Sequence, residues 1–303
     1  MPLSMFYFLA VAAINILMSW SLYLPYRAQQ LHFMTVANMT ISGYLGAYAA
    51  LNWGWPFALI LLAGIVIGGI VGFVTSIAIG DAPAFAVVIV GFTFIYITKT
   101  IVENMDAFGG TMGLFGIPMV AGTPGANRWL LFAIAWSMVF LVGFFIHRFD
   151  NSRLGRAASA IFVDKTLAAS FGVNIKRMGM GLQTAGSAIG GMCGVLYAFT
   201  MRSLFPEFFT FHYIGIAMTM LFIGGYTTLW GVLLAVPILW GLPFLLPEAV
   251  QSWRIVIYGV LLITILLLKP EGIITRPLIR RVQEVLGRRR APAKAGTDAK
   301  EGT

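Results

Sequence analysis

The chain has 303 residues, of which 59% are hydrophobic and 10% are charged, and its mean hydropathy is +0.88. Soluble domains carry about 25% charged residues, so this composition excludes an ordinary soluble protein and indicates a polytopic membrane protein. The formal net charge of +9 does not indicate a nucleic-acid-binding protein, because the basic residues gather in one mid-chain loop and in the tail, with no large soluble domain around them.

Residue types that hold metals are sparse. The single cysteine, Cys193, excludes an intramolecular disulfide and a cysteine-based metal site. The three histidines, His32, His147 and His212, are scattered and show no ligand spacing. We therefore expect no metal and no bound cofactor on this chain. The N-terminal apolar run has no basic segment and no clear cleavage site, so we interpret it as a first span and not as a removed signal peptide.

A helix that crosses the hydrocarbon core needs about 20 mostly apolar residues, and nine segments fit that description. We expect an all-α bundle of about nine transmembrane helices over residues 1–272. The second segment is the weakest, because it carries Asn38, Thr40 and Ser42, and a broken or partly re-entrant segment is the alternative there. The nine segments are 4–25, 32–52, 55–79, 83–101, 129–147, 179–200, 210–227, 229–247 and 252–268.

Lysine and arginine favour the cytoplasmic side of a membrane protein. With nine spans, Arg27, the loop 148–177 and the chain from Lys269 onward fall on one side and hold 16 of the 20 lysines and arginines. We therefore predict that the N-terminus lies outside, and that loop 148–177 and the C-terminus lie inside. The tail, 273–303, is a basic stretch that we expect to lie at lipid head groups.

Small residues recur at intervals of four in two of the predicted spans. The third span carries Gly64, Gly68, Gly72 and Ser76, and the sixth carries Gly186, Gly190, Gly194 and Ala198. Spacing by four places each set along one stripe of a helix, where small side chains let two helix backbones approach closely. The stripes predict tight helix seams, either static or beside a moving pathway.

Ionisable groups deep in a bilayer usually mark ion or proton pathways, and the span centres here have almost none. Lys99 and Glu103 lie one turn apart near the outer end of the fourth span, where we expect them to pair. No Gly-Lys pair occurs in the sequence, so a phosphate-binding GxxxxGK[ST] loop is absent. An active transporter built on this chain would take its energy from another subunit.

Uncharged polar residues within the spans are candidates to line a pathway. For any one of them, a hydrogen bond between helices is the alternative interpretation. These residues are Asn15, Asn38, Thr40, Thr93, Tyr96, Thr98, Gln183, Thr184 and Ser187.

The outer segment GGTMGLFGIP is too short and too rich in glycine to form a span. We expect it to form a structured gate near the outer mouth and not a plain turn, because backbone polar groups at membrane depth must face water or protein. Its key residues are Gly109, Gly110, Gly113, Gly116 and Pro118.

The segment 148–177 is the only long polar stretch between hydrophobic spans. Asp164 is a good N-cap and Gly172 suits a helix C-terminus, which predicts a short helix with Leu167, Ala168 and Phe171 on one side. Upstream, the residues 154–158 offer a small-residue surface beside guanidinium groups. A loop that served only as a topology signal would explain the basic residues but not the cap and the stop. We therefore expect this loop to dock on a partner.

Several motifs of this chain, in this order over about 250 residues, resemble those of branched-chain amino acid ABC transporter permeases. In the loop they are Gly155-Arg156-Ala157, Ala160-Ile161, Asp164, Ala168 and Gly172-Val173. Elsewhere they are Asn15-Ile16-Leu17, Gly46-Ala47-Tyr48, the segment from Gly109 to Pro118, Leu196-Tyr197-Ala198, Gly224-Gly225, Leu246-Pro247-Glu248 and Lys269-Pro270-Glu271-Gly272.

The resemblance implies a permease subunit in the cell inner membrane that pairs with a second permease, with two ATPase subunits that bind ATP and Mg, and with a periplasmic substrate-binding protein. The loop would transmit closure of the ATPases to the spans. The residues implied in that coupling are Arg153, Gly155, Arg156, Ala157, Asp164, Ala168 and Gly172. Related permeases carry urea, short amides and other small polar metabolites, and these substrates are alternatives. A stand-alone secondary transporter and an integral-membrane enzyme are the competing classes.

The chain departs from the family pattern at a few positions. The family loop often carries arginine where this chain has Ser159 and Phe162, and an acidic residue where it has Lys165. The family's glycine-rich segment after the first span is altered around Tyr26 and Arg27. These departures suggest a different pairing with the cognate ATPase.

Overall fold

The computed structural model describes residues 3–80, 82–245, 253–269 and 272. In this part the chain is all-helical apart from one short two-stranded ladder, and a helix occupies each of the nine predicted segments. The long helices are α1 (Leu3–Tyr26), α2 (Met34–Trp53), α3 (Phe57–Ile79), α4 (Ala84–Glu103), α5 (Pro124–Asp150), α8 (Ile175–Met201), α9 (Phe211–Gly224), α10 (Leu229–Leu245) and α12 (Arg254–Leu268). The predicted tail and the motif at 246–248 lie outside the described residues.

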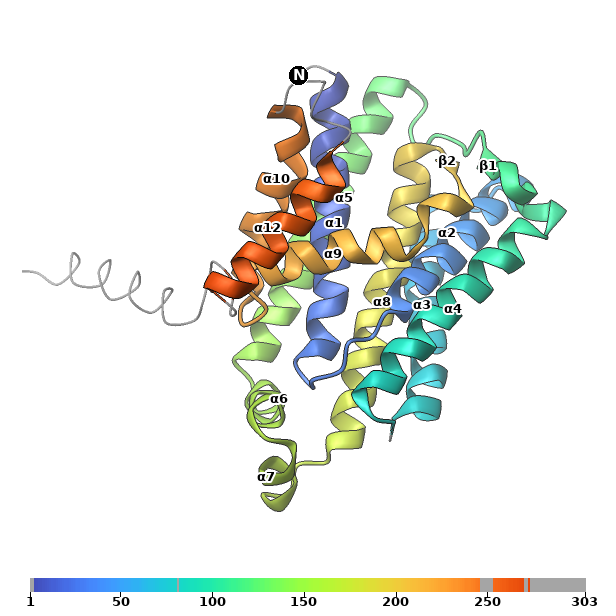
Figure 1. Ribbon diagram of the computed structural model, residues 1–303. Helices are drawn as coiled ribbons and strands as arrows, with labels where there is room; N and C mark the ends of the chain where they lie inside the picture. Colours follow the sequence, from blue (N-terminus) through green and yellow to red (C-terminus); the bar gives the residue numbers. More distant parts are fainter. Residues whose placement is uncertain (1–2, 81, 246–252, 270–271, 273–303) are drawn as a thin grey trace, which may run out of the picture.

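Six described helical segments are long and apolar enough to cross a membrane, which makes the chain a multi-pass membrane protein. They are Met5–Tyr26, Phe57–Ile79, Phe85–Glu103, Pro124–Asp150, Ile175–Met201 and Pro206–Gly224. The last of these includes a 3₁₀ turn before α9, and α9 runs across α1 and not along it (Figure 1). The count of nine spans therefore stays a prediction.

The second predicted segment is one unbroken helix, so the alternative of a broken segment is wrong. Its polar side chains Asn38, Thr40 and Ser42 are buried against other helices, which explains why a segment of modest hydropathy is helical here. These polar side chains of α2 face other helices of the protein and not lipid.

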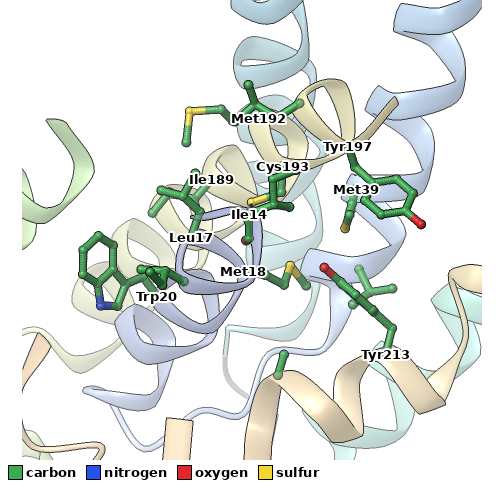
Figure 2. Packing of buried hydrophobic residues seen from close by; sticks show 14 of the residues in the cluster. Ile14, Leu17, Met18, Trp20, Met39, Ile189, Met192, Cys193, Tyr197 and Tyr213 are labelled. Carbon is green, nitrogen blue, oxygen red and sulfur yellow. Dashed lines mark hydrogen bonds between the residues drawn. The ribbon is translucent and has the colours of Figure 1, made fainter. Parts of the chain in front are cut away.

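Helix α8 is the centre of the bundle and packs most extensively against α3, α2 and α1 (Figure 1). It runs antiparallel to α1, since the Cys193 thiol lies 3.8 Å from the Ile14 carbonyl oxygen, while Gly186 lies against Ser21. Figure 2 shows this core, in which Ile14 and Leu17 of α1 lie beside Cys193 and Ile189 of α8.

The two glycine stripes form two separate seams on α8. The stripe of α3 packs against Ser187 and Gly191, and the added Cβ of an alanine at Gly68 would lie only 2.5 Å from the Ser187 carbonyl oxygen. The stripe of α8 itself lies on a neighbouring face, where Gly190 and Gly194 pack on the α2 backbone. Small residues on two adjacent faces of α8 thus let both α2 and α3 approach it closely.

The two long non-spanning segments lie at opposite ends of the bundle (Figure 1). One end carries the short helices α6 (Arg153–Val163) and α7 (Lys165–Ser170). The other end carries the N-terminus of α1 and the ladder of β1 (Leu114–Phe115) with β2 (Ser203–Leu204).

Candidate functional site

Two adjoining short helices, α6 and α7, form the mid-chain loop. The cap and stop predicted α7, whereas α6 was not predicted as a helix. Ser152 caps α6, and its hydroxyl oxygen accepts from the Gly155 amide at 3.2 Å. Asp164 ends α6 and caps α7, because its Oδ1 accepts from the amides of Thr166 and Leu167 at 2.8 and 3.0 Å. Gly172 follows α7 with φ of +80°, the left-handed conformation that glycine adopts without strain.

The two short helices each bury one side, which carries Gly155, Ala158 and Ile161 in α6 and Ala168 in α7. Gly155 and Ala158, part of the small-residue surface expected to face a partner, therefore pack inside this chain. Ala168 is only 1% exposed, so it does not share the exposed surface of Leu167 and Phe171. Large apolar side chains are exposed at Leu154 (60%), Val163 (83%), Leu167 (54%) and Phe171 (80%).

The other predicted coupling residues complete this outer surface. Arg153 and Arg156 are exposed on α6, and Ala157 is half-buried. Gly155 lies against the last turn of α5, where an added Cβ would overlap the Phe149 carbonyl oxygen and lie 2.8 Å from Asp150 Cα. Helix α6 is therefore pressed directly onto the end of α5, and the surface that it leaves free is apolar and basic.

A buried polar cluster fastens α6 to α1 and α5. Arg27 is 5% exposed, and its Nε lies 3.6 Å from Asp150 Oδ1. Tyr23 donates to Asp150 Oδ2 at 2.7 Å, and the Arg27 guanidinium donates to Ser159 Oγ on α6. Helix α6 is therefore attached to the adjoining ends of two long helices, α1 and α5.

An aromatic cluster makes a second connection from α6. The ring of Phe162 lies 5.5 Å from that of Tyr26 and 5.6 Å from that of Tyr226, in the turn between α9 and α10. Gln29 Nε2 also donates to the Phe162 carbonyl oxygen at 2.6 Å. Sequence reasoning marked Arg27, Tyr26, Ser159 and Phe162 only as departures from a pattern. A single sequence does not indicate that these four residues contact one another. The one available hint is that all four differ from the family pattern.

The chain between α1 and α2 does not return to the surface but enters the bundle interior. Gln183 Nε2 donates to Gln30 Oε1 at 2.7 Å, and His32 Nε2 lies 3.1 Å from Ser187 Oγ. Ser187 is twelve residues into α8, which is about 18 Å along the helix axis. His32 is fully buried there, so a histidine set aside as scattered in the sequence is at the depth of the span centres.

Several polar atoms around this point have no hydrogen-bond partner among the described residues. They include both amide atoms of Asn38, Gln183 Oε1, His32 Nδ1 and the Thr35 hydroxyl. Buried polar groups in proteins are usually paired with protein or with ordered water. This cluster of unpaired atoms between α2 and α8 is therefore suited to bind water or a polar solute.

The remaining pathway candidates divide into two groups. Asn15 accepts a hydrogen bond from Tyr213 at 2.9 Å, and Thr40 donates to the Val36 carbonyl at 3.0 Å, so both are buried in helix contacts. Thr93 and Tyr96 are exposed on α4 and lie apart from the buried cluster. The hydrophobic side of α4 that packs on α2 carries neither residue.

The glycine-rich outer segment is structured, as expected. Gly109, Gly110, Gly113 and Gly116 all have positive φ, between +58° and +81°. The strand β1 within the segment pairs with β2, and the Arg202 guanidinium donates to the Ile117 carbonyl at 2.9 Å, next to Pro118. The segment thus closes over one end of α8.

The predicted pair of Lys99 and Glu103 forms at 3.3 Å, and Lys99 also contacts Glu207 at 2.7 Å. The charges therefore satisfy one another near the outer segment. No group of three or more histidine, cysteine, aspartate or glutamate residues that could hold a metal occurs in the described part of the chain.

Comparison with known proteins identifies a family. Residues 4–266 match the family described as branched-chain amino acid transport system / permease component. The probable branched-chain amino acid transport permease protein LivM of Methanocaldococcus jannaschii is 28% identical over 259 residues, which cover 76% of this chain and 74% of that relative.

Two bacterial relatives are covered less completely. The high-affinity branched-chain amino acid transport system permease protein LivM of Salmonella typhimurium is 26% identical over 81% of this chain and 66% of the relative. The protein of the same description from Escherichia coli is 28% identical over 50% of this chain and 36% of the relative. No solved structure matches the chain.

Proposed function

Because this chain belongs to the branched-chain amino acid transport system permease family, we propose that it is the membrane-spanning subunit of an ABC importer. It carries branched-chain or related amino acids across the cell inner membrane, and ATP hydrolysis on partner subunits drives the transport. The partners are two ATPase subunits, a second homologous permease and a periplasmic substrate-binding protein. The chain itself has no ATPase site, and ATP and Mg bind to the ATPases.

The observation that carries this proposal is the surface of α6 and α7. Monomeric soluble surfaces rarely expose several large apolar side chains together, and such patches mark interaction sites. Here Val163, Leu167 and Phe171 are exposed beside Arg153 and Arg156, at the end of the bundle where the chain leaves the membrane. The same helices are fixed to the spans by the buried Arg27 cluster, which supports a role in transmitting force.

We place the substrate pathway along the interface of α2 and α8. The unpaired polar atoms of Asn38, Gln183 and His32, together with Ser187, support this placement. Transporters commonly bind their substrates near the midplane, beside irregular backbone that lines a cavity. The connection between α1 and α2 is such a segment. The outer segment from Gly109 to Pro118 gates this pathway.

The topology follows from the two ends of the bundle. We propose nine spans, with the N-terminus and the outer segment outside, and with α6, α7 and the basic tail 273–303 inside. Arg27 and the loop 148–177 share one end, which agrees with the excess of basic residues expected on the cytoplasmic side.

A pair of matched variants tests the docking surface. Phe171→Asp places a carboxylate on α7, and Met112→Asp does the same at a side chain that is 76% exposed in the outer segment. We expect Phe171→Asp to abolish co-purification of the ATPase subunits and ATP-driven uptake, because a desolvated carboxylate disfavours an apolar contact. Met112→Asp should keep the ATPases bound.

Two further results would reject the proposal. One is uphill uptake by the purified chain alone in liposomes, which would show a stand-alone transporter. The other is normal ATPase binding by the Phe171→Asp variant. Uptake of labelled leucine in competition with urea and acetamide by the reconstituted complex distinguishes an amino-acid importer from an importer of short amides.

A further inference from the structure

A long groove lies between α5 and α8, next to α6. Its volume is about 780 Å³, and its lining is almost entirely apolar. Phe145 and Phe149 of α5 form one wall, and Leu154 of α6 lines the end. None of the hydrogen bonds or ion pairs of the Arg27 cluster lies in this groove, and the groove borders the outer surface of α6 at Leu154 and Ala157.

The hollow exists because α8 presents small residues to it. Gly181 and Ala185 are exposed along the groove floor, and an added Cβ at Gly181 would meet no atom within 4 Å. The other glycines of α8 from Gly186 onward contact the backbones of neighbouring helices, but Gly181 contacts none. The groove is thus open space on a membrane-facing surface, where hydrocarbon and not water is the solvent.

The length of the groove matches one leaflet. It extends along α8 from Arg177 to Ile189, twelve residues that rise about 18 Å. The hydrocarbon core of a bilayer is about 30 Å thick, so the groove covers slightly more than one half of it. Its polar side chains, Arg177 and Asn174, lie together at the end next to α6. The groove is therefore polar at the α6 end and apolar along the rest of its length, which matches the head group and acyl chains of an amphiphile.

The charge at this end is available for a ligand. Arg177 is exposed, and among the described residues no acidic side chain forms an ion pair with it. A guanidinium between transmembrane helices on the cytoplasmic side is suited to bind the phosphate of an anionic lipid. A helix of a second copy fits less well, because it would continue past the membrane face and meet Leu154 and Ala157 of α6.

We propose that this groove binds one anionic phospholipid from the leaflet on the α6 side. Its phosphate contacts Arg177, and its acyl chains lie over Gly181 and Ala185, against Phe145. The lipid touches α5, α6 and α8 together, so its binding stiffens the junction between the short helices and the spans. The lipid site does not depend on which substrate the protein transports.

Native mass spectrometry of the purified full chain tests this site, with phosphatidylglycerol and phosphatidylcholine of equal acyl chains added in turn. We expect one phosphatidylglycerol to be retained in preference to phosphatidylcholine. Arg177→Gln should weaken phosphatidylglycerol binding by about fivefold and phosphatidylcholine binding by less, because the choline cation already offsets the charge of that phosphate. Arg156→Gln, an exposed arginine of α6 outside the groove, is the matched control.

Gly181→Trp places a large side chain in the groove at a position where an added Cβ meets no atom within 4 Å, and it should remove the retention of both lipids. Gly215→Trp is its control, since Gly215 also has open space around it but lies on α9. Unchanged lipid binding in Gly181→Trp, or an unchanged lipid preference in Arg177→Gln, would overturn the proposal. Conversion of dimers to monomers by Gly181→Trp, with no change in lipid binding, would assign the groove to a second copy instead.

Discussion

The Arg27 cluster gives the sharpest test of how α6 is joined to the spans. The side chains of Arg27 and Asp150 are only 6% and 11% exposed. Replacing one partner of a buried ion pair leaves the other charge uncompensated, which costs about 3–5 kcal/mol. The distance of 3.6 Å between Arg27 Nε and Asp150 Oδ1 is long for an ion pair. For Arg27→Met we therefore expect a loss of folding free energy at the lower end of that range, about 3 kcal/mol. That loss corresponds to a fall in the unfolding midpoint of roughly 6–12 °C.

The functional effect should be larger than the effect on folding. Without Arg27, α6 loses its hydrogen bond through Ser159 to α1 and keeps its aromatic contacts through Phe162. We expect the complex with Arg27→Met to hydrolyse ATP while its uptake falls, because nucleotide-driven movement of α6 no longer reaches α1. Thermal unfolding in detergent, ATPase activity and uptake in proteoliposomes measure the three quantities separately.

A double-mutant cycle separates the ion pair from general damage. Arg27→Met combined with Asp150→Leu removes both charges, so the double variant should be more stable than the sum of the single losses predicts, by about 2 kcal/mol. Arg156→Met, on the exposed side of α6, should unfold like the unchanged protein. Strictly additive losses, or an Arg27→Met variant that transports normally at full stability, would refute the coupling role of the cluster.

Two pairs of glycine variants test the close contacts. Gly155→Val overlaps the end of α5 and should lower ATP-driven uptake about tenfold or more with the ATPases still bound. At Gly172 the added side chain meets open space, so Gly172→Val should cost only the strain of a left-handed φ, about 1–2 kcal/mol of folding free energy. Uptake that is equal in the two variants would contradict this ranking. Gly72→Ala overlaps the Ser187 side chain and should destabilise the bundle by about 1–3 kcal/mol in thermal unfolding. Gly69→Ala, whose added Cβ has its nearest neighbour at 3.7 Å, should be neutral or slightly stabilising.

The helices and their caps could be predicted because they depend on neighbouring residues. Runs of apolar residues located all nine long helices to within a few residues. The cap at Asp164 and the stop at Gly172 are local hydrogen-bonding and backbone features, and both occur where predicted. The pairing of Lys99 with Glu103 likewise follows from a spacing of four on one helix.

The contacts between distant segments could not be predicted in the same way. The glycine stripes of α3 and α8 do not pack against each other. The stripe of α3 meets Ser187 and Gly191 of α8, whereas Gly190 and Gly194 in the stripe of α8 meet the α2 backbone. His32 looks isolated in the sequence, yet the chain after α1 turns inward and brings it to Ser187, 155 positions away. The face of a short helix is also set by what it packs on, which is why the small residues near Gly155 are buried and not offered to a partner.

The departures from the family pattern become one feature when they are placed in space. In the pattern that the resemblance implied, arginine often occupies the position of Ser159, which here faces Arg27 of α1. Two guanidinium groups at this buried point would repel each other, since like charges in a low dielectric are strongly unfavourable. An arginine on α1 therefore requires a small neutral residue on α6, and Ser159 meets that requirement by accepting a hydrogen bond. The rings of Phe162 and Tyr26 pack edge to face beside this joint. In this chain the contact of α6 with α1 therefore combines a guanidinium of α1 on a hydroxyl of α6 with an aromatic contact.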